Sequence, residues 1–182
     1  MTVSANFCYS LFIFLFLFCP VVFAVLYKKE KLNKVLALIL LGLYIVALII
    51  GVFTKASIKN GVFSIRLDYS AGWANKTIKF NILKTRKVDF LINSVLLFPI
   101  GVILSLFLSY KNKPIKKQLI SLLVVGFVIG LFIEFMQFLL PIARSVQLSD
   151  LLLNTISSVM GGLYFVFVNS ITKKLRKKAL SE

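Results

Sequence analysis

Two polar side chains interrupt an apolar segment of the chain. Glu134 and Gln137 are one helical turn apart in the run from Gly130 to Leu140, whose other residues are all apolar. A carboxylate inside a membrane-spanning helix is costly unless it is paired, hydrated or protonated. We therefore expect Glu134 to face the interior of a helix bundle, where an ionisable residue is a candidate functional residue.

A second polar pattern, D-x3-N-x7-G, occurs twice. Its residues are Asp89, Asn93, Gly101, Asp150, Asn154 and Gly162. The i, i+4 spacing places each Asp and its Asn on one helix face, about 6 Å apart along the axis. The two Asp residues could simply cap helices, with Ser149 assisting. The amides lie one turn deeper and need hydrogen bonds to a neighbouring helix. The repetition favours a duplication whose two copies point the same way.

These residues predict a polar pocket built by three helices, with Arg144 at its rim. The candidate ligand-binding residues are Asp89, Asn93, Glu134, Gln137, Arg144, Asp150 and Asn154. All belong to one half of the predicted bundle, and we expect no comparable polar set in the other half. Close helix packing explains Gly101, Gly161 and Gly162, while Pro99 predicts a kink.

Several kinds of chemistry are excluded by composition. The chain has no His, so it holds neither a Ser-His-Asp nor a Cys-His catalytic set nor a His-ligated metal. Cys8 and Cys19 share one predicted helix and would lie about 16 Å apart, too far for a disulfide. We expect no cofactor and no resident metal.

The elements that must position these residues are membrane-spanning helices. The chain has 182 residues, 59% of them hydrophobic, and a mean hydropathy of +0.96. Each of five apolar blocks could cross about 30 Å of hydrocarbon as a helix. They lie near residues 7–27, 35–54, 90–110, 118–140 and 150–171. We predict an all-α integral membrane helical bundle of about five transmembrane helices, forming one domain over residues 1–182.

The loop between the second and third blocks, residues 55–88, has a different periodicity. Apolar and polar residues alternate in "VFSIRLDY" (62–69) and in "TIKFNIL" (77–83), separated by "SAGWAN". Period two predicts short strands with one buried face. We expect these two segments to pair as a small β-hairpin outside the membrane; an irregular basic loop is the alternative.

The net charge of +16 is concentrated beside the predicted spans. Residues 28–34 and 111–117 carry four Lys each, and residues 173–178 carry five Lys or Arg. This pattern is typical of membrane orientation and anionic-lipid contact rather than nucleic-acid binding. Five spans place these segments on one side, which the positive-inside rule makes cytoplasmic, so the N-terminus would be outside. The eight Lys or Arg of loop 55–88 count against this orientation, although at lower density.

The polar motifs together resemble the VanZ-like membrane proteins. The resemblance rests on E-x2-Q-x6-R-x5-D-x3-N-x6-G-G from Glu134 to Gly162 and on D-x3-N-x4-F-P-x-G from Asp89 to Gly101. It covers about half of the chain, and the Pro-Phe that members often carry before the third span is absent from "FNILKTRK" (80–87). The resemblance implies a bacterial cell-membrane protein associated with resistance to teicoplanin and related lipoglycopeptides.

Three functions are compatible with these features. The first is a non-enzymatic protein of the outer leaflet that binds a lipid-linked cell-wall precursor or the antibiotic, with Arg144 contacting phosphate or carboxylate. The second is an intramembrane enzyme acting on an envelope lipid or precursor, with Glu134 and Asp150 as candidate acid and base. In that case Asp89 and Asp150 could hold a divalent metal. The third is a small transporter. Membrane lipids are expected partners in each case.

Overall fold

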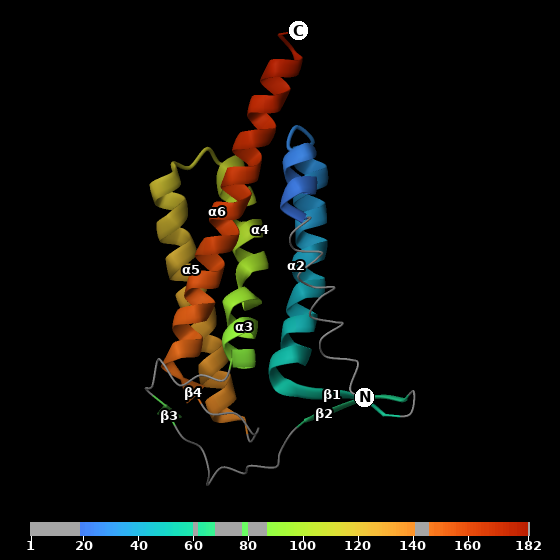
Figure 1. The fold of residues 1–182 in the computed structure, drawn as a ribbon, viewed down its shortest axis with the longest axis vertical. Helices are drawn as coiled ribbons and strands as arrows, with labels where there is room; N and C mark the ends of the chain where they lie inside the picture. Colours follow the sequence, from blue (N-terminus) through green and yellow to red (C-terminus); the bar gives the residue numbers. More distant parts are fainter. Residues whose placement is uncertain (1–18, 60–61, 68–77, 80–86, 141–145, 182) are drawn as a thin grey trace.

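The computed structural model describes residues 19–59, 62–67, 78–79, 87–140 and 146–181, and there the chain is a helix bundle (Figure 1). Its helices are α2 (Glu30–Phe53), α3 (Lys87–Leu96), α4 (Phe98–Tyr110), α5 (Ile115–Leu139) and α6 (Leu148–Ala179), preceded by a helical segment at residues 19–25. Within these ranges, four segments are long and apolar enough to cross a membrane. The predicted helical membrane bundle is confirmed, although most of the span at 7–27 lies outside the described residues.

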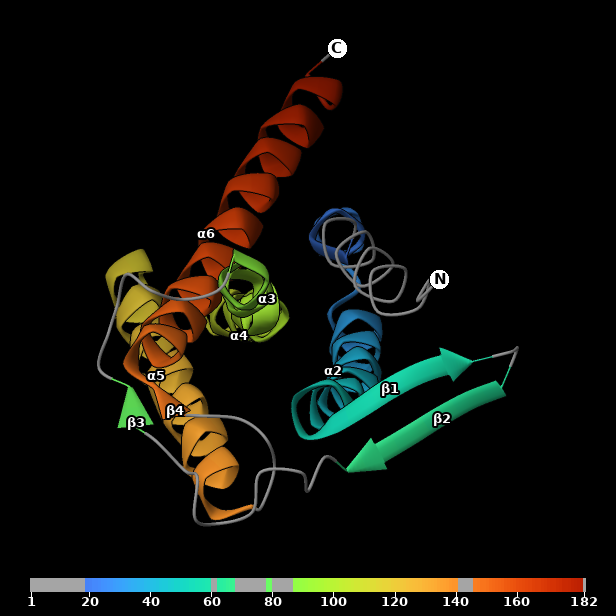
Figure 2. The same cartoon turned by 60° about the horizontal axis from the view of Figure 1, so that its bottom comes forward.

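Helix α6 is the centre of the bundle. It packs against α3, α4 and α5, whereas α2 lies on the far side of α4 (Figures 1 and 2). Helices α4 and α6 run in the same direction, and α5 runs opposite to both. Large apolar side chains on the outer faces, such as Leu43, Phe132 and Phe167, are more than half exposed. Lipid tails would cover such a surface, which is rare on a soluble monomer.

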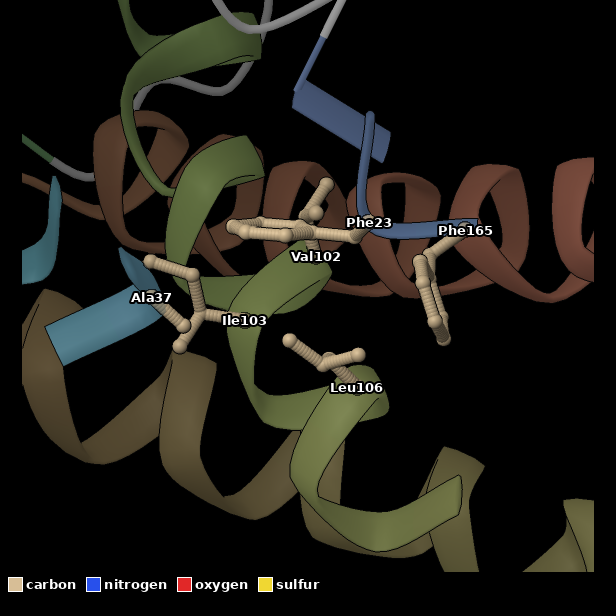
Figure 3. Close-up of a cluster of buried hydrophobic side chains, with 6 residues drawn as sticks. All are labelled: Phe23, Ala37, Val102, Ile103, Leu106 and Phe165. Carbon is tan, nitrogen blue, oxygen red and sulfur yellow. The ribbon is translucent and has the colours of Figure 1, made fainter. Parts of the chain in front are cut away.

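A cluster of apolar side chains joins α2 to the rest of the bundle (Figure 3). It brings together the segment before α2 with α2, α4 and α6, through the buried residues Phe23, Ala37, Val102, Ile103, Leu106 and Phe165. Ala37 is the small residue that allows α2 to approach, since a larger side chain there would separate the helices.

Glycines bring α4 into backbone contact with α6. A Cβ atom at Gly101 would overlap the Ser158 carbonyl oxygen, and one at Gly161 would overlap the Phe98 carbonyl oxygen. The role predicted for these glycines is confirmed. A Cβ atom at Gly101 would also lie 3.0 Å from the Gly162 nitrogen, so the ends of the two D-x3-N-x7-G copies are in close contact. Both copies run in the same direction, as predicted, whereas their origin by duplication stays a prediction.

The third predicted span is two helices rather than one kinked helix. Helix α3 ends at Leu96, and Leu97 precedes α4 with φ −100° and ψ 5°. Pro99 lies in the first turn of α4, where its fixed φ is tolerated and its missing N–H leaves no helical bond unmade. The chain is therefore interrupted at Leu97, two residues before Pro99, whereas a kink within one helix was predicted.

The strands of the loop do not pair as predicted. Strand β2 (Val62–Leu67) pairs antiparallel with β1 (Thr54–Lys59), which follows α2 directly, and not with residues 77–83. Strand β3 (Ile78–Lys79) instead pairs in parallel with β4 (Val146–Gln147), just before α6. The two strands of the hairpin are separated by Asn60 and Gly61, a pair strongly favoured in two-residue hairpin turns. The Asn-Gly pair therefore identifies β1 as the partner of β2.

The three basic segments lie at one end of the bundle, and all four strands lie at the other (Figure 1). At the basic end, the ring of Tyr27 stacks on Tyr110 with 4.8 Å between centroids, and its hydroxyl donates to the Ser109 carbonyl oxygen. Arg176 of α6 donates to the Ala24 carbonyl oxygen. The prediction that these segments share one side is confirmed. That this side is cytoplasmic stays a prediction.

Candidate functional site

The register between α5 and α6 places the two candidate carboxylates opposite each other. These antiparallel helices meet where Gly126 faces Ser158 and where a Cβ at Gly130 would lie 3.3 Å from the Asn154 Cβ. One turn further along α5 is Glu134, and one turn back along α6 is Asp150. The small Gly130 is therefore what lets the polar face of α6 come close to α5 beside these two residues.

The polar residues of this end form a buried cluster. Five of the predicted site residues are at least nine-tenths buried, namely Asn93, Glu134, Gln137, Asp150 and Asn154. Four come from α5 and α6, and Asn93 comes from α3, which packs on α6. Asn93 precedes Gly101 by eight residues, as Asn154 precedes Gly162, so the contact between these glycines places both amides at a similar depth. We call these five residues the α5–α6 polar cluster.

Glu134 fixes the beginning of α6. Its Oε2 accepts a hydrogen bond of 3.0 Å from the backbone N–H of Gln147, the N-cap residue, whose own side chain makes no capping hydrogen bond. In a capping box, a side chain of the same helix accepts this N–H. Here a carboxylate from the neighbouring helix accepts it, so Glu134 has a structural role whatever else it does.

Asp150 lies in the first turn of α6, three residues after the N-cap Gln147. The interpretation of Asp150 as an N-cap is therefore wrong, because the helix begins earlier, where strand β4 ends. The hydroxyl of Ser149 donates to Asp150 Oδ1 at 3.3 Å. The positive end of the α6 dipole stabilises negative charge at this position. Both carboxylates thus lie at the N-terminus of one helix.

Deeper in the bundle, three buried polar atoms lack hydrogen-bond partners among the described residues. Asn154 Oδ1, Ser157 Oγ and Ser105 Oγ are buried and form no hydrogen bond with any residue that the structure describes. A buried acceptor without a donor costs about 1–3 kcal/mol, and such groups in proteins generally bind water or a ligand. Ser157 was not predicted as a site residue. Its position three residues after Asn154, on the same helix face, was the available signal.

Two predicted site residues remain untested. Asp89 is the third residue of α3, but its side chain lies outside the described residues, and Arg144 falls in the segment 141–145, which is outside them as well. No group of three His, Cys, Asp or Glu residues that could hold a metal occurs in the described ranges. A metal held by Asp89 and Asp150 is therefore not tested.

The other half of the bundle is not as apolar as predicted. Asn33, Gln118 and Asn169 are also more than nine-tenths buried and lie near the basic end. Asn33 donates to the Phe23 carbonyl oxygen at 2.9 Å and to the Tyr110 hydroxyl at 2.8 Å. The expectation of a single polar half was wrong because these three amides lie singly on α2, α5 and α6 and form no motif in the sequence. Buried polar residues therefore lie in both halves of the bundle.

A family model that matches most of the chain identifies the family of this protein. The family model described as VanZ/LLP1 matches residues 6–169. The chain belongs to the VanZ/LLP1 family. The match includes both D-x3-N-x7-G copies and all five residues of the α5–α6 polar cluster, so the VanZ resemblance is confirmed and extends well beyond the motifs. Comparison with curated proteins found no match, and neither did comparison with solved structures.

Proposed function

We propose that this VanZ/LLP1-family protein binds the polar group of a cell-envelope ligand in the α5–α6 polar cluster. The observation that supports it best is Asn154 Oδ1, an acceptor buried beside two carboxylates and an amide and without a hydrogen-bond donor among the described residues. The donor would come from a hydroxyl or amide of the ligand, or from water that the ligand replaces.

The position of the cluster suggests which side the ligand comes from. The cluster lies at the end of the bundle opposite the basic segments, and the positive-inside rule assigns basic segments to the cytoplasm. The cluster would then open to the outer leaflet. A lipid-linked cell-wall precursor, with its phosphates, sugars and peptide, offers hydroxyl and amide donors for Asn154 and an anion for Arg144.

Binding of such a precursor would give a route to antibiotic resistance. Teicoplanin is a lipoglycopeptide that acts on the precursor at the outer leaflet. A protein that binds the precursor or the drug would therefore reduce binding of the drug to the precursor. The family resemblance implies this role in a bacterial membrane, and we propose the α5–α6 polar cluster as the binding site for it.

An intramembrane enzyme is the second candidate, favoured by Glu134 and Asp150 facing each other across α5 and α6. The bond from Gln147 to Glu134 makes Glu134 less available as a proton carrier and leaves Asp150 as the stronger candidate. Altered envelope lipids or muropeptides on overexpression of wild type, absent with Asp150→Asn, would favour this function over binding alone.

Direct binding tests the proposal. Purified protein in lipid nanodiscs would be titrated with a lipid-linked cell-wall precursor and, separately, with teicoplanin. Asn154→Leu, which keeps the shape but removes the acceptor, should weaken binding of the true ligand about tenfold or more. Met160→Leu, a lipid-facing change in the same helix, should bind as wild type does. Equal affinities of wild type and a folded Asn154→Leu variant for both probes would contradict the proposal.

A further inference from the structure

A second polar pocket lies at the basic end of the bundle. It has a volume of about 310 Å³ and is bounded by the α4–α5 turn, the start of α5 and the last part of α6. The lining residues that matter here are Tyr27, Ser109, Lys113, Gln118, Asn169 and Lys173. We call it the basic-end pocket. It shares no residue with the α5–α6 polar cluster and lies at the opposite end of α6.

The positive charge of the basic-end pocket favours an anionic ligand. Lys113 comes from the α4–α5 turn and Lys173 from α6, and the Lys173 Nζ lies 4.7 Å from the centre of the Tyr27 ring. A cation–π contact of this kind holds the ammonium group at the pocket. The nearby carboxylate of Glu30 forms an ion pair with Lys34. The surrounding segments 111–117 and 173–178 add further positive charge.

Two buried amides supply a second, independent feature. Gln118 and Asn169 are more than nine-tenths buried and line the pocket, yet Gln118 Oε1 and Asn169 Oδ1 have no hydrogen-bond partner in the part of the chain that the structure describes. The Gln118 amide is oriented by its Nε2, which donates to the Lys113 carbonyl oxygen at 2.8 Å. Its oxygen is therefore the atom left for a ligand. A ligand must bring hydroxyl or amine donors as well as negative charge.

We propose that the basic-end pocket binds the phosphoglycerol headgroup of an anionic membrane lipid. The phosphate would pair with Lys113 and Lys173, and the glycerol hydroxyls would donate to Gln118 Oε1 and Asn169 Oδ1. A lipid is the source because the pocket lies where the apolar spans ending at Tyr110 and beginning at Ile115 meet the basic turn. Ile115 and Val166 also line the pocket and would provide apolar contact for the acyl-chain carbons nearest the headgroup.

The test compares lipids of equal charge. The full chain, purified in a neutral detergent, would be titrated with short-chain phosphatidylglycerol, with phosphatidylserine of the same chain length, and with free glycerol 3-phosphate, while binding is followed by native mass spectrometry and by thermal stability. Phosphatidylglycerol should bind at least about tenfold more tightly than phosphatidylserine, whose ammonium group faces the lysines. Equal affinity for the two lipids would overturn the headgroup assignment. Binding of glycerol 3-phosphate as tightly as the lipid would overturn the lipid as its source.

Matched variants locate the binding. Lys173→Gln should weaken phosphatidylglycerol binding about tenfold, whereas Lys174→Gln, its exposed neighbour that does not line the pocket, should not. Asn169→Leu should reduce the preference for phosphatidylglycerol over phosphatidylserine and leave the lysines in place. Equal losses for Lys173→Gln and Lys174→Gln would show general attraction to the basic surface and overturn the pocket. Lys173 is on the surface, so its variant tests the proposal even if Asn169→Leu does not fold.

Discussion

Glu134 has a structural role at the start of α6 and also belongs to the proposed binding site. Its carboxylate accepts the N–H of Gln147 at the start of α6 and lies opposite Asp150. Any ligand that reaches the α5–α6 polar cluster therefore meets a carboxylate that already holds the backbone of the neighbouring helix. Substitutions at Glu134 mix a loss of stability with any loss of binding, which makes Asp150 and Asn154 the better residues for functional tests.

This role gives a stability prediction. Glu134→Ala leaves the half-buried N–H of Gln147 without this acceptor and should lower the free energy of unfolding by about 1–3 kcal/mol. Glu134→Gln keeps an acceptor oxygen and should cost less. Phe135→Leu, a change at the lipid-facing residue next to it, serves as the control. Thermal unfolding in detergent measures all three. A Glu134→Ala variant that melts with wild type would show that this hydrogen bond does not stabilise α6.

At the same scale, the sequence predicted burial better than hydrogen bonding. A carboxylate among apolar residues must face inward, and Glu134 does. The partner of Glu134 was not predictable, because Gln147 is thirteen residues away and comes close only through the end of α5 and strand β4. Asp150 was misplaced as an N-cap for the same reason: the start of α6 depends on a tertiary contact.

At the scale of the elements, the contact between α4 and α6 determines the geometry of the bundle. Gly101 and Gly161 lack the Cβ atoms that would overlap carbonyl oxygens of the facing helix. Small residues allow membrane helices to approach closely, where packing and weak hydrogen bonds replace the missing hydrophobic drive. The packing of α3 on α6 also brings Asn93 into the α5–α6 polar cluster.

The glycines provide a prediction with an internal control. Gly101→Ala and Gly161→Ala should each destabilise the protein by about 1–3 kcal/mol, because the added methyl group meets backbone atoms that cannot move aside. Gly42→Ala, where a Cβ would meet nothing within 4 Å, should be neutral or stabilising by up to about 1 kcal/mol. Denaturant or thermal unfolding in detergent measures the difference. Equal stability of all three variants would show that the close α4–α6 approach does not depend on Gly101 and Gly161.

Helix positions were predictable because apolar blocks of this length have few alternatives in a membrane. Strand pairing was harder. Residues 62–69 have the right alternation, but periodicity does not specify a partner, and the extended segment after α2 has weaker alternation than residues 77–83. The Asn-Gly pair at residues 60–61 carried that information.

At the scale of the whole molecule, the two ends of the bundle differ in charge. The basic segments gather at one end and the α5–α6 polar cluster lies at the other. With the positive-inside rule, this polarity predicts a basic-end pocket in the inner leaflet and a polar cluster that opens to the outer one. Both proposals depend on this orientation for the choice of ligand.

Cysteine labelling tests the orientation. In a background with Cys8 and Cys19 changed to Ser, Asn60→Cys should react with an impermeant maleimide in intact cells. Lys113→Cys and Lys178→Cys should react only after the membrane is permeabilised. Labelling of residue 113 from outside would reverse the orientation and place the α5–α6 polar cluster toward the cytoplasm.

We propose that the α5–α6 polar cluster is the functional site of the protein, and drug susceptibility tests this claim. Teicoplanin and vancomycin susceptibility would be compared in a sensitive Gram-positive host expressing wild type, Asp150→Asn, Asn154→Leu or the lipid-facing control Leu152→Ala at matched membrane abundance. We predict protection against teicoplanin by wild type and Leu152→Ala, and its loss in both cluster variants. Protection by Asp150→Asn and Asn154→Leu equal to that by wild type would contradict the claim. So would the absence of protection by wild type.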